Sequence, residues 1–543
     1  MAYFKDLREY LRTLEDRGKL VRVKREINKD TELHPLVRLQ FRGLPEEERK
    51  GWLFENVVDS KGKKYKAPVA VSVIAASTEV YAIGMACEPD QITEKWREAV
   101  RNPIEPKLVD DGPVHGEVHI GDGLLEHGGL GEFPVPISTP GFDSGPFITS
   151  PYWVTKDPET GIVNVGTYRV HVKSPTRTGM MAGSQRQHIA IHLAKAAARG
   201  VPLEAAIVVG GPPSLGYVSV NRLPTDVNEL AFVGGIAGEP LEVVKCKTVN
   251  LEVPAHAEIV IEGELSTTEL EPEAPFGEAY GLMGRRTAMP YFDVKCITHR
   301  TDAIWQAFLS QFPPSESSKI RGTGREGFVR SYLREDHNIP EVIDIAMHES
   351  CGSCGLMVIR IGKNNGEEIA DQDKVWRALE EGSAFLGNAG LGSKMFVAVD
   401  KDVDPRDPDL VNWAIFTRVQ PHRDVRIKKY PLGSIMDCSI ADPRIQERRG
   451  VHYQEQPGHS HLLINATIKW PYPPISLPKK EFMERALSIW QEEGFPDLKL
   501  KWPWYGYSLG LWSDEEDEHA MLAAQGEWAK VGDILAQRRK KVE

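Results

Sequence analysis

A succession of short strand-forming runs, spread over the middle of the 543-residue chain, limits the fold more than any other feature of the sequence. Turn residues separate these runs, and only one or two helical segments interrupt them. Short strands joined by turns are typical of a sheet that closes on itself, so a barrel or a closed antiparallel sheet is expected here. The runs are residues 162–172, 205–209, 243–253, 256–261 and 291–297.

Both flanks of this region mix helical and strand patterns, which predicts α/β domains on either side of it. A chain of this length exceeds one ordinary hydrophobic core, so we expect two or three domains. The expected helices are residues 3–17, 91–100 and 372–386, and the expected strands are 51–57, 68–73, 342–347, 356–361 and 395–399.

Composition excludes several classes of function. The net charge of −12 disfavours nonspecific nucleic-acid binding, which depends on basic patches. The longest apolar runs fall far below the roughly 20 residues of a membrane helix, and the charged, amphipathic opening does not resemble a secretory signal. Six cysteines in so long a chain do not form a disulfide framework, so a cytoplasmic protein is expected.

The most distinctive local segment is EPEAPFGEAYG, residues 271–281, which carries Glu273 and Glu278. Pro275 and Gly277 exclude a continuous helix, so both carboxylates are expected on a turn. Two carboxylates held close together do not both ionise easily, and the one whose pKa rises can donate a proton. The alternative is an ordinary acidic loop in solvent.

The run IVNVGTYRVHV, residues 162–172, carries Asn164 and Arg169. An arginine inside a barrel can form a two-pronged bond with a carboxylate or a flavin carbonyl. Strand alternation places these two residues on opposite faces unless Gly166 marks a bulge. The alternative for Arg169 is an ordinary strand residue.

A helix over residues 184–200 places His188 in its first turn and His192 one turn later. Farther along, Glu229 lies in the first turn of a short helix within 223–232. Oxygen donors with a single imidazole suit Mg²⁺ or Mn²⁺ better than Zn²⁺. The alternative is that both histidines simply pack or face solvent.

Two further motifs favour no specific chemistry. Cys351 and Cys354 form a CxxC without the second pair that a four-cysteine zinc site needs, so both are interpreted as structural thiols. Residues 208–214, VVGGPPS, have neither dinucleotide-binding nor P-loop spacing.

Together, and in this order, these segments resemble the UbiD family of decarboxylases, through most of the chain. DLREYLRTLEDRGKLVRVKREIN (6–28) resembles the family's N-terminal helix and following strand, and E-A-P-F-G-E (273–278) is the most specific piece. Other similar blocks are LFENV (53–57), GVPLEAAIVVGGPP (200–213), GEPLEVVKCKTVNLEVPAHAEIVIEGEL (238–265) and DPDLVNWAIFTRVQP (407–421).

The resemblance implies a role for each candidate residue. Glu278 would reprotonate the substrate carbon, while Glu273 and Arg169 would orient the cofactor and tune that acid. Asn164, His188 and Glu229 would hold a divalent metal, Mn²⁺ or Mg²⁺, that bridges the cofactor phosphate. The implied cofactor contacts are Asn164, Arg169, Gln187, His188, Glu229 and Lys394, and the backbone near 218–219 would bind K⁺.

The resemblance also implies a mixed α/β and β architecture of three domains, with a split β-barrel like that of flavin reductases at its centre. The expected cofactor is prenylated FMN, supplied by a separate flavin prenyltransferase, and the expected assembly is a homo-oligomer of two to six copies. The implied parts are an N-terminal α/β domain (1–115), the cofactor-binding barrel (116–320), a C-terminal α/β oligomerisation domain (321–500) and a tail with a helix (501–543).

The expected activity is reversible decarboxylation of an aromatic or α,β-unsaturated carboxylic acid, with no nucleic acid or membrane as partner. The alternative is a noncatalytic or flavin-reductase-like subunit of a larger complex. The sequence departs from the family at residues 279–281 and 455–471, where substrate selection is expected. Basic residues of 422–433, Arg426 and Lys428 among them, would meet an extra anionic group or a CoA thioester, or else form a solvated strand or an oligomer contact.

Overall fold

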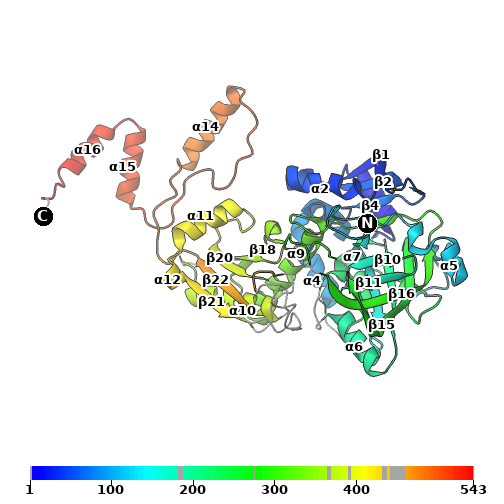
Figure 1. Cartoon of the computed structure of the whole chain (residues 1–543). Coiled ribbons are helices and arrows are strands. Elements are labelled where there is room, and N and C mark those ends of the chain that lie inside the picture. Colours follow the sequence, from blue (N-terminus) through cyan, green and yellow to red (C-terminus); the bar gives the residue numbers. More distant parts are fainter. Residues whose placement is uncertain are drawn as a thin grey trace.

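Four β-sheets organise the computed structural model of the chain (Figure 1). The structure describes residues 3–181, 187–221, 223, 226–273, 275–284, 286–363, 369–388, 393–430, 437–440 and 459–541. Helices cover the two terminal sheets, while the large central sheet curls on itself. This is the mixed α/β and β architecture with a central split barrel that the sequence predicts.

The first sheet has the strand order β1 (Leu20–Asn28), β2 (Gly51–Val58), β4 (Val69–Val71), β17 (Trp305–Ala307), with β3 (Lys64–Tyr65) paired to β2. Its last strand comes from far along the chain and pairs in parallel with β4. The expected N-terminal helix is confirmed as α1 (Leu7–Asp16), shorter than predicted because the Asp6 side chain accepts a hydrogen bond from Glu9 N and begins the helix there. Other helices of this domain are α2 (Leu33–Gly43), α3 (Thr78–Met85) and α4 (Ile92–Arg101).

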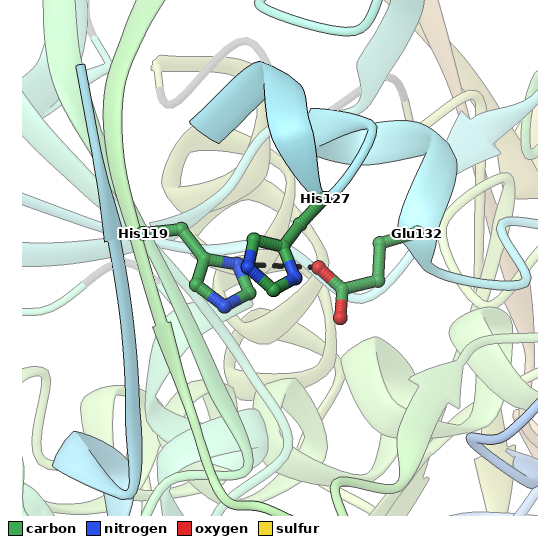
Figure 2. A group of neighbouring side chains, drawn as sticks. All are labelled: His119, His127 and Glu132. Atoms are coloured by element: carbon green, nitrogen blue, oxygen red, sulfur yellow. Dashed lines mark ion pairs between the residues drawn. The ribbon is translucent and has the colours of Figure 1, made fainter. Parts of the chain in front are cut away.

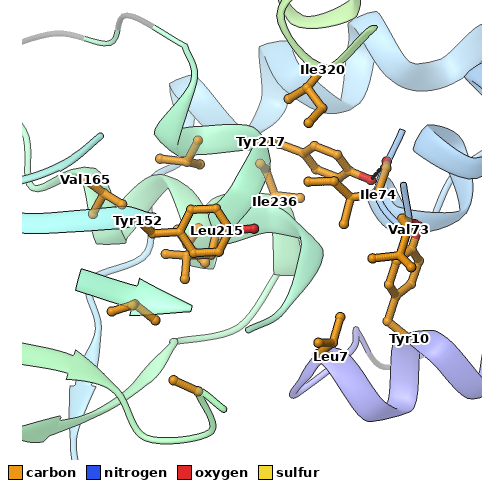
Figure 3. Close-up of a cluster of buried hydrophobic side chains, with 14 of the residues drawn as sticks. Leu7, Tyr10, Val73, Ile74, Tyr152, Val165, Leu215, Tyr217, Ile236 and Ile320 are labelled. Carbon is orange, nitrogen blue, oxygen red and sulfur yellow. Dashed lines mark hydrogen bonds between the residues drawn. The ribbon is translucent and has the colours of Figure 1, made fainter. Parts of the chain in front are cut away.

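A shared core joins this first domain to the barrel, as Figure 3 shows. Tyr10 of α1 donates a hydrogen bond to the carbonyl of Val73 at 2.8 Å. Tyr217, from the short helix α7 (Pro213–Ser219), donates to the carbonyl of Ile74 at 2.8 Å. Both rings are fully buried, and these hydrogen bonds give each phenol oxygen a partner inside the core.

The nine-stranded central sheet is antiparallel throughout its described pairings. Its long strands β15 (Ile259–Glu273) and β16 (Thr287–His299) form the middle of the sheet. The full order is β7 (Phe147–Ile148), β10 (Val170–Ser174), β11 (Arg177–Met180), β16, β15, β12 (Leu203–Val209), β8 (Tyr152–Lys156) and β9 (Val163–Thr167), with β6 (Glu117–Ile120) paired to β16.

The prediction of one continuous strand over 162–172 is wrong. The chain forms β9 at one edge of the sheet and then β10 next to the opposite edge, with only Tyr168 and Arg169 between them. The three Cα–Cα steps from Thr167 to Val170 span about 11 Å at most, so the two edges must approach each other and the sheet must curl. Gly166 is required here because a Cβ at that position would lie 2.3 Å from the Tyr168 ring. Instead of a bulge at Gly166, the chain changes sheet edge between Asn164 and the strand that follows Arg169.

The C-terminal domain agrees closely with its predicted elements. Its sheet has the order β18 (Val342–Met347), β19 (Leu356–Ile361), β20 (Met395–Asp400), β22 (Ser460–Ala466), β21 (Val425–Lys429). The predicted helix 372–386 is α10 (Gln372–Asn388), and α11 (Pro408–Arg418) is a further helix of this domain. Between the barrel and this sheet lies α9 (Glu316–Ser331).

The end of the chain projects away from the sheets (Figure 1). It carries α14 (Lys480–Glu492), α15 (Asp514–Ala524) and α16 (Trp528–Ala536), none of which has a buried residue. Among the described helices, not one combines the length and the apolar character needed to traverse a bilayer.

Candidate active site

Arg169 joins Glu273 and Glu278 in one network of ion pairs. Arg169 Nε and Nη2 donate to the two carboxylate oxygens of Glu273 at 2.9 and 2.6 Å, and Nη1 donates to Glu278 Oε1 at 2.6 Å. The side chains of Glu273, Arg169 and Glu278 are 0%, 10% and 19% exposed. Arg169 therefore contacts both predicted acids, which lie more than 100 residues farther along the chain, and the two glutamates are not part of a solvated acidic loop.

Different elements position these three side chains. Glu273 is the last residue of β15, and Arg169 lies in the two-residue link between β9 and β10. Glu278 lies on the turn that follows β15, where Glu278 N donates to the Leu282 carbonyl at 2.7 Å. The predicted turn is confirmed, and Gly277 is required in it because a Cβ there would lie 2.5 Å from the Gln311 side chain.

Burial raises the pKa of Glu273, and the negative charge of Glu278 adds to this effect, while the bonds from Arg169 oppose it. Burial acts to lower the pKa of Arg169, but its two carboxylate partners outweigh burial and leave it above the ordinary value. One carboxyl pKa is therefore raised, that of the more buried acid Glu273, but mainly by burial and only secondarily by the charge of the other carboxylate. Arg169 also lies over the Phe276 ring, 5.4 Å from its centroid.

A fourth titratable group next to Arg169 was not predicted. Asp143 accepts a hydrogen bond from Thr139 N at 2.7 Å, while its Oδ1 is buried without a hydrogen-bond partner. Burial raises the pKa of this carboxyl to about 6, although the charge of Arg169 opposes the rise. Its segment, 138–146, reads as an irregular Gly/Pro-rich passage, so the only signal in the sequence was an acid among turn residues.

The three predicted metal ligands also converge. His188 Nδ1 lies 3.1 Å from Asn164 Oδ1 and 3.1 Å from Glu229 Oε1, and all three side chains are buried. Glu229 Oε2 accepts a hydrogen bond from Val165 N at 2.6 Å, which fixes the orientation of the carboxylate. Burial raises the pKa of Glu229, partly offset by His188.

This donor set fits a hard divalent cation that is shared with another ligand. Two oxygens and one imidazole nitrogen face one another, the mixture that suits Mn²⁺ or Mg²⁺. His188 Nε2 and Asn164 Nδ2 are buried without hydrogen-bond partners, so the site has polar atoms that the protein leaves unsatisfied. His188 is the first residue of α6 (His188–Ala198), and Glu229 is the first of α8 (Glu229–Ala237).

The other predicted residues have different surroundings. His192, one turn along α6, bonds to Thr155 Oγ1 at 3.0 Å, and burial lowers its pKa to about 4, so it is a packed histidine. Gln187 immediately precedes α6, whereas Lys394 lies in the C-terminal domain and pairs with Asp437 at 2.8 Å. Residues 184–186 of the predicted helix lie outside the described part of the chain.

Two arginines of the predicted basic segment are already paired. Arg426 pairs with Glu380 at 2.7 Å and lies over the Trp376 ring at 3.8 Å, and Arg423 pairs with Asp424. A different pair of arginines lies closer to the Glu278 turn. Arg321 and Arg325, one turn apart on α9, interact electrostatically with Cys354, which forms a hydrogen bond with Tyr280, two residues after Glu278.

These two arginines are incompletely paired. Nε and Nη2 of Arg321 are buried without hydrogen-bond partners, and no carboxylate of the described chain pairs with Arg325. Burial lowers the pKa of Arg325 to about 10 despite the thiol of Cys354, and the charge of Arg321 adds to the effect. The sequence shows the two arginines only as an ordinary i, i+4 pair, so their proximity to the turn could not be predicted from it.

Three family models match successive parts of the chain. They describe the N-terminal, Rift-related and C-terminal domains of 3-octaprenyl-4-hydroxybenzoate carboxy-lyase and match residues 11–100, 108–312 and 319–448. Among similar sequences, an uncharacterized protein of Archaeoglobus fulgidus is 30% identical over 507 residues, which cover 91% of this chain and 99% of that protein.

Solved structures show the same architecture. The UbiD-class enzyme HmfF from Pelotomaculum thermopropionicum, in an evolved dimeric form with prFMN, superposes with a TM-score of 0.73 at 30% identity, covering 89% of this chain and all of that one. The vanillic acid decarboxylase of Sedimentibacter hydroxybenzoicus superposes with a TM-score of 0.73 at 27% identity, covering 91% of this chain and all of that one.

Proposed function

The chain belongs to the UbiD family of carboxy-lyases, and from this we propose that it is a prenylated-FMN-dependent enzyme that reversibly decarboxylates an aromatic or α,β-unsaturated carboxylic acid. The observation that carries the proposal is the largely buried Arg169–Glu273–Glu278 network, with a separate metal-type donor set formed by Asn164 of β9, His188 of α6 and Glu229 of α8. Structural neighbours bind prFMN or FMN, which supports a flavin cofactor.

Loss of CO₂ from an sp² carbon leaves an electron pair that no side chain can delocalise, and the modified flavin, when bound, supplies that electron sink. The chain's own residues then need only orient the reactants and move one proton. Glu278 is the proposed proton carrier because it is the least buried of the three and lies on a turn. Its proton replaces the carboxylate on the substrate carbon as the C–C bond breaks.

Glu273 and Arg169 have a positioning role in this scheme. The two-pronged bond fixes Glu273 at the end of β15, and Arg169 keeps Nη1 available for Glu278. Asn164, His188 and Glu229 would hold Mn²⁺ or Mg²⁺ against the cofactor phosphate, with Gln187 and Lys394 as further proposed cofactor contacts. The backbone near residues 218–219 remains the proposed K⁺ site.

Arg321 and Arg325 support a finer statement about the substrate. Two incompletely paired cations beside the Glu278 turn would be satisfied by an additional negative charge, so the substrate is proposed to carry an anionic group besides the carboxylate that leaves. A second carboxylate or a CoA phosphate has this chemistry. Arg426 is a weaker candidate for the role because Glu380 already neutralises it.

The alternative is a noncatalytic or flavin-reductase-like subunit. The intact contacts among Arg169, Glu273 and Glu278 argue against it, because a subunit without turnover has no need to keep two carboxylates and an arginine in a buried network. A cytoplasmic homo-oligomer supplied by a separate flavin prenyltransferase remains the proposed setting, and an evolved dimeric form among the structural neighbours supports self-association.

The test is to coexpress the chain with a flavin prenyltransferase, record the flavin absorbance of the purified protein and assay CO₂ release. A panel of aromatic and acrylic mono- and dicarboxylic acids should include at least one that loses CO₂. Exchange of the substrate carbon proton with deuterated solvent gives a second readout. A flavin-loaded protein that neither releases CO₂ nor exchanges protons with any acid would favour the noncatalytic alternative.

A further inference from the structure

A second cluster of metal-type side chains lies at the far end of the barrel (Figure 2). It consists of His119 on β6, His127 just after α5 (Asp122–Glu126) and Glu132 at the end of the short helix η4 (Gly129–Glu132). His299, the last residue of β16, adds a third imidazole. Because β16 begins opposite Glu273 and ends at His299, 12 residues later, roughly 40 Å of strand separates this cluster from the catalytic network.

The ligand atoms of the cluster lie at distances that one ion can bridge. His119 Nδ1 is 3.2 Å from Glu132 Oε2, and His299 Nε2 is 3.8 Å from Glu132 Oε1. One ligand atom from each of His119, His127 and Glu132 lies within 4.8 Å of the others. Ligands held at 2.0–2.1 Å from a tetrahedral metal are about 3.3 Å apart, so the cluster needs only small movements to close on an ion.

The protein leaves these atoms unsatisfied. His119 Nδ1, Glu132 Oε2 and His299 Nε2 are all buried without hydrogen-bond partners. Buried polar atoms normally have a partner, so three such atoms around one point form an arrangement that a cation would satisfy. A metal ion placed among these nitrogen and oxygen atoms would satisfy all three of them at once.

The tautomer of His299 supports the same conclusion. Its Nδ1 donates to the carbonyl of Arg300 at 2.7 Å, which leaves Nε2 with a free lone pair directed at Glu132. His119 Nδ1 also faces Glu132, 3.2 Å from Oε2, and is buried. His127 is exposed and stacks on the His119 ring at 3.8 Å, so a turn of its side chain brings a nitrogen to the same point.

We propose that His119, Glu132, His299 and His127 form a second metal site, distinct from the one at Asn164, His188 and Glu229, that binds a divalent transition metal, with Zn²⁺ as the best match. Three imidazoles and one carboxylate suit Zn²⁺, whereas Mg²⁺ and Ca²⁺ prefer oxygen ligands. The site would have a structural role, because it ties residues 121–132 to the ends of β6 and β16. Phe133, which follows Glu132, packs edge-on against His299.

The test measures metal binding, so it does not depend on enzymatic activity. In a His188→Ala background, which removes the only imidazole of the first site, the metal-free full-length protein is titrated with Zn²⁺ against a chromophoric chelator. Co²⁺ is then added in place of Zn²⁺, and its ligand-field absorbance reports nitrogen-rich tetrahedral coordination. We expect one bound Zn²⁺ per chain, a rise in melting temperature on binding and an intense visible Co²⁺ spectrum.

Two variants and a control locate the ion. His127→Ala changes an exposed side chain and should fold normally, yet lower the Zn²⁺ affinity at least about tenfold, and Glu132→Gln should lower it further. His422→Ala, which removes another exposed histidine, should leave the affinity unchanged. The proposal is overturned if the background protein binds no Zn²⁺, or if His127→Ala and Glu132→Gln both bind it as tightly as the control.

Discussion

Arg169 bonds to Glu278 through Nη1 at 2.6 Å while its other two donors stay on Glu273. The two carboxylates are therefore held differently by the same guanidinium. Arg169 donates two bonds to Glu273, at the end of a strand, and one bond to Glu278, on a turn. In the proposed mechanism, Glu278 is therefore the acid that we expect to leave Arg169 and carry the proton, while Glu273 stays in place.

Glu278→Gln should lower kcat at least about 100-fold, because an amide has no acidic proton to give to the substrate carbon. Flavin and metal content should stay at wild-type levels, since Glu278 contacts neither Asn164 nor His188. Turnover and flavin absorbance of the same preparation check both statements. Turnover equal to wild type would show that another group supplies the proton.

His188→Ala and Glu229→Gln should each lower metal and flavin content together, with metal affinity falling at least about tenfold. The reason is that the proposed metal links the protein to the cofactor phosphate. Elemental analysis and flavin absorbance after purification measure both quantities. His192→Ala is the matched control, because His192 is equally buried on the same helix but bonds to Thr155. If both variants keep full metal and flavin content, His188 is a packed histidine and not a metal ligand.

Asp143→Asn should change how stability depends on pH. The folded pKa of Asp143, about 6, lies above its ordinary value of 3.8, so folding favours the protonated form. The stabilisation from the raised pKa of Asp143 is fully present below about pH 4, and it is lost as the pH rises toward 6. An asparagine stays neutral at every pH. The free energy of unfolding of the variant should therefore rise relative to that of wild type between about pH 4 and pH 6, and the difference should stay constant above pH 6.

Because Asp143 is partly open to solvent, the expected advantage above pH 6 is only on the order of 1 kcal/mol. Melting temperatures of both proteins between pH 4 and pH 8 test this. For the control Asp497→Asn, at an exposed position, the difference in melting temperature from wild type should not change over this pH range. A difference between Asp143→Asn and wild type that does not vary with pH would contradict the role assigned to burial.

Arg325→Gln should raise the KM of a substrate that carries a second negative charge by about tenfold, with kcat little changed, because the guanidinium contributes to binding and not to proton transfer. For a simple monocarboxylate, the KM and kcat of the variant should equal those of wild type. Arg330→Gln, near the end of the same helix, removes an arginine whose Nε donates to the Ile343 carbonyl at 2.9 Å, and serves as control. An equal KM change for both substrates would exclude recognition of the extra charge.

Local patterns were sufficient to predict most elements of the two flanking domains. Strands 342–347 and 356–361 match β18 and β19, because a buried strand next to a helix has a periodicity that a short stretch of chain already displays. The turn at Pro275 and Gly277 was predictable for the same reason, since the backbone restrictions of these residues are local. Resemblance to known motifs then supplied the grouping of Glu273, Glu278 and Arg169.

The sequence by itself determined which residues can ionise, bond a metal or form a turn, because these properties belong to single side chains and their immediate neighbours. Only the tertiary structure decided which of them meet. Strand alternation separated Asn164 from Arg169, but it could not show that the chain changes sheet edge between them. Asp143 beside Arg169, the arginine pair near Tyr280 and the His119–Glu132–His299 cluster all arise from contacts between distant segments. Such contacts are fixed by how the sheet curls and packs, which no local pattern records.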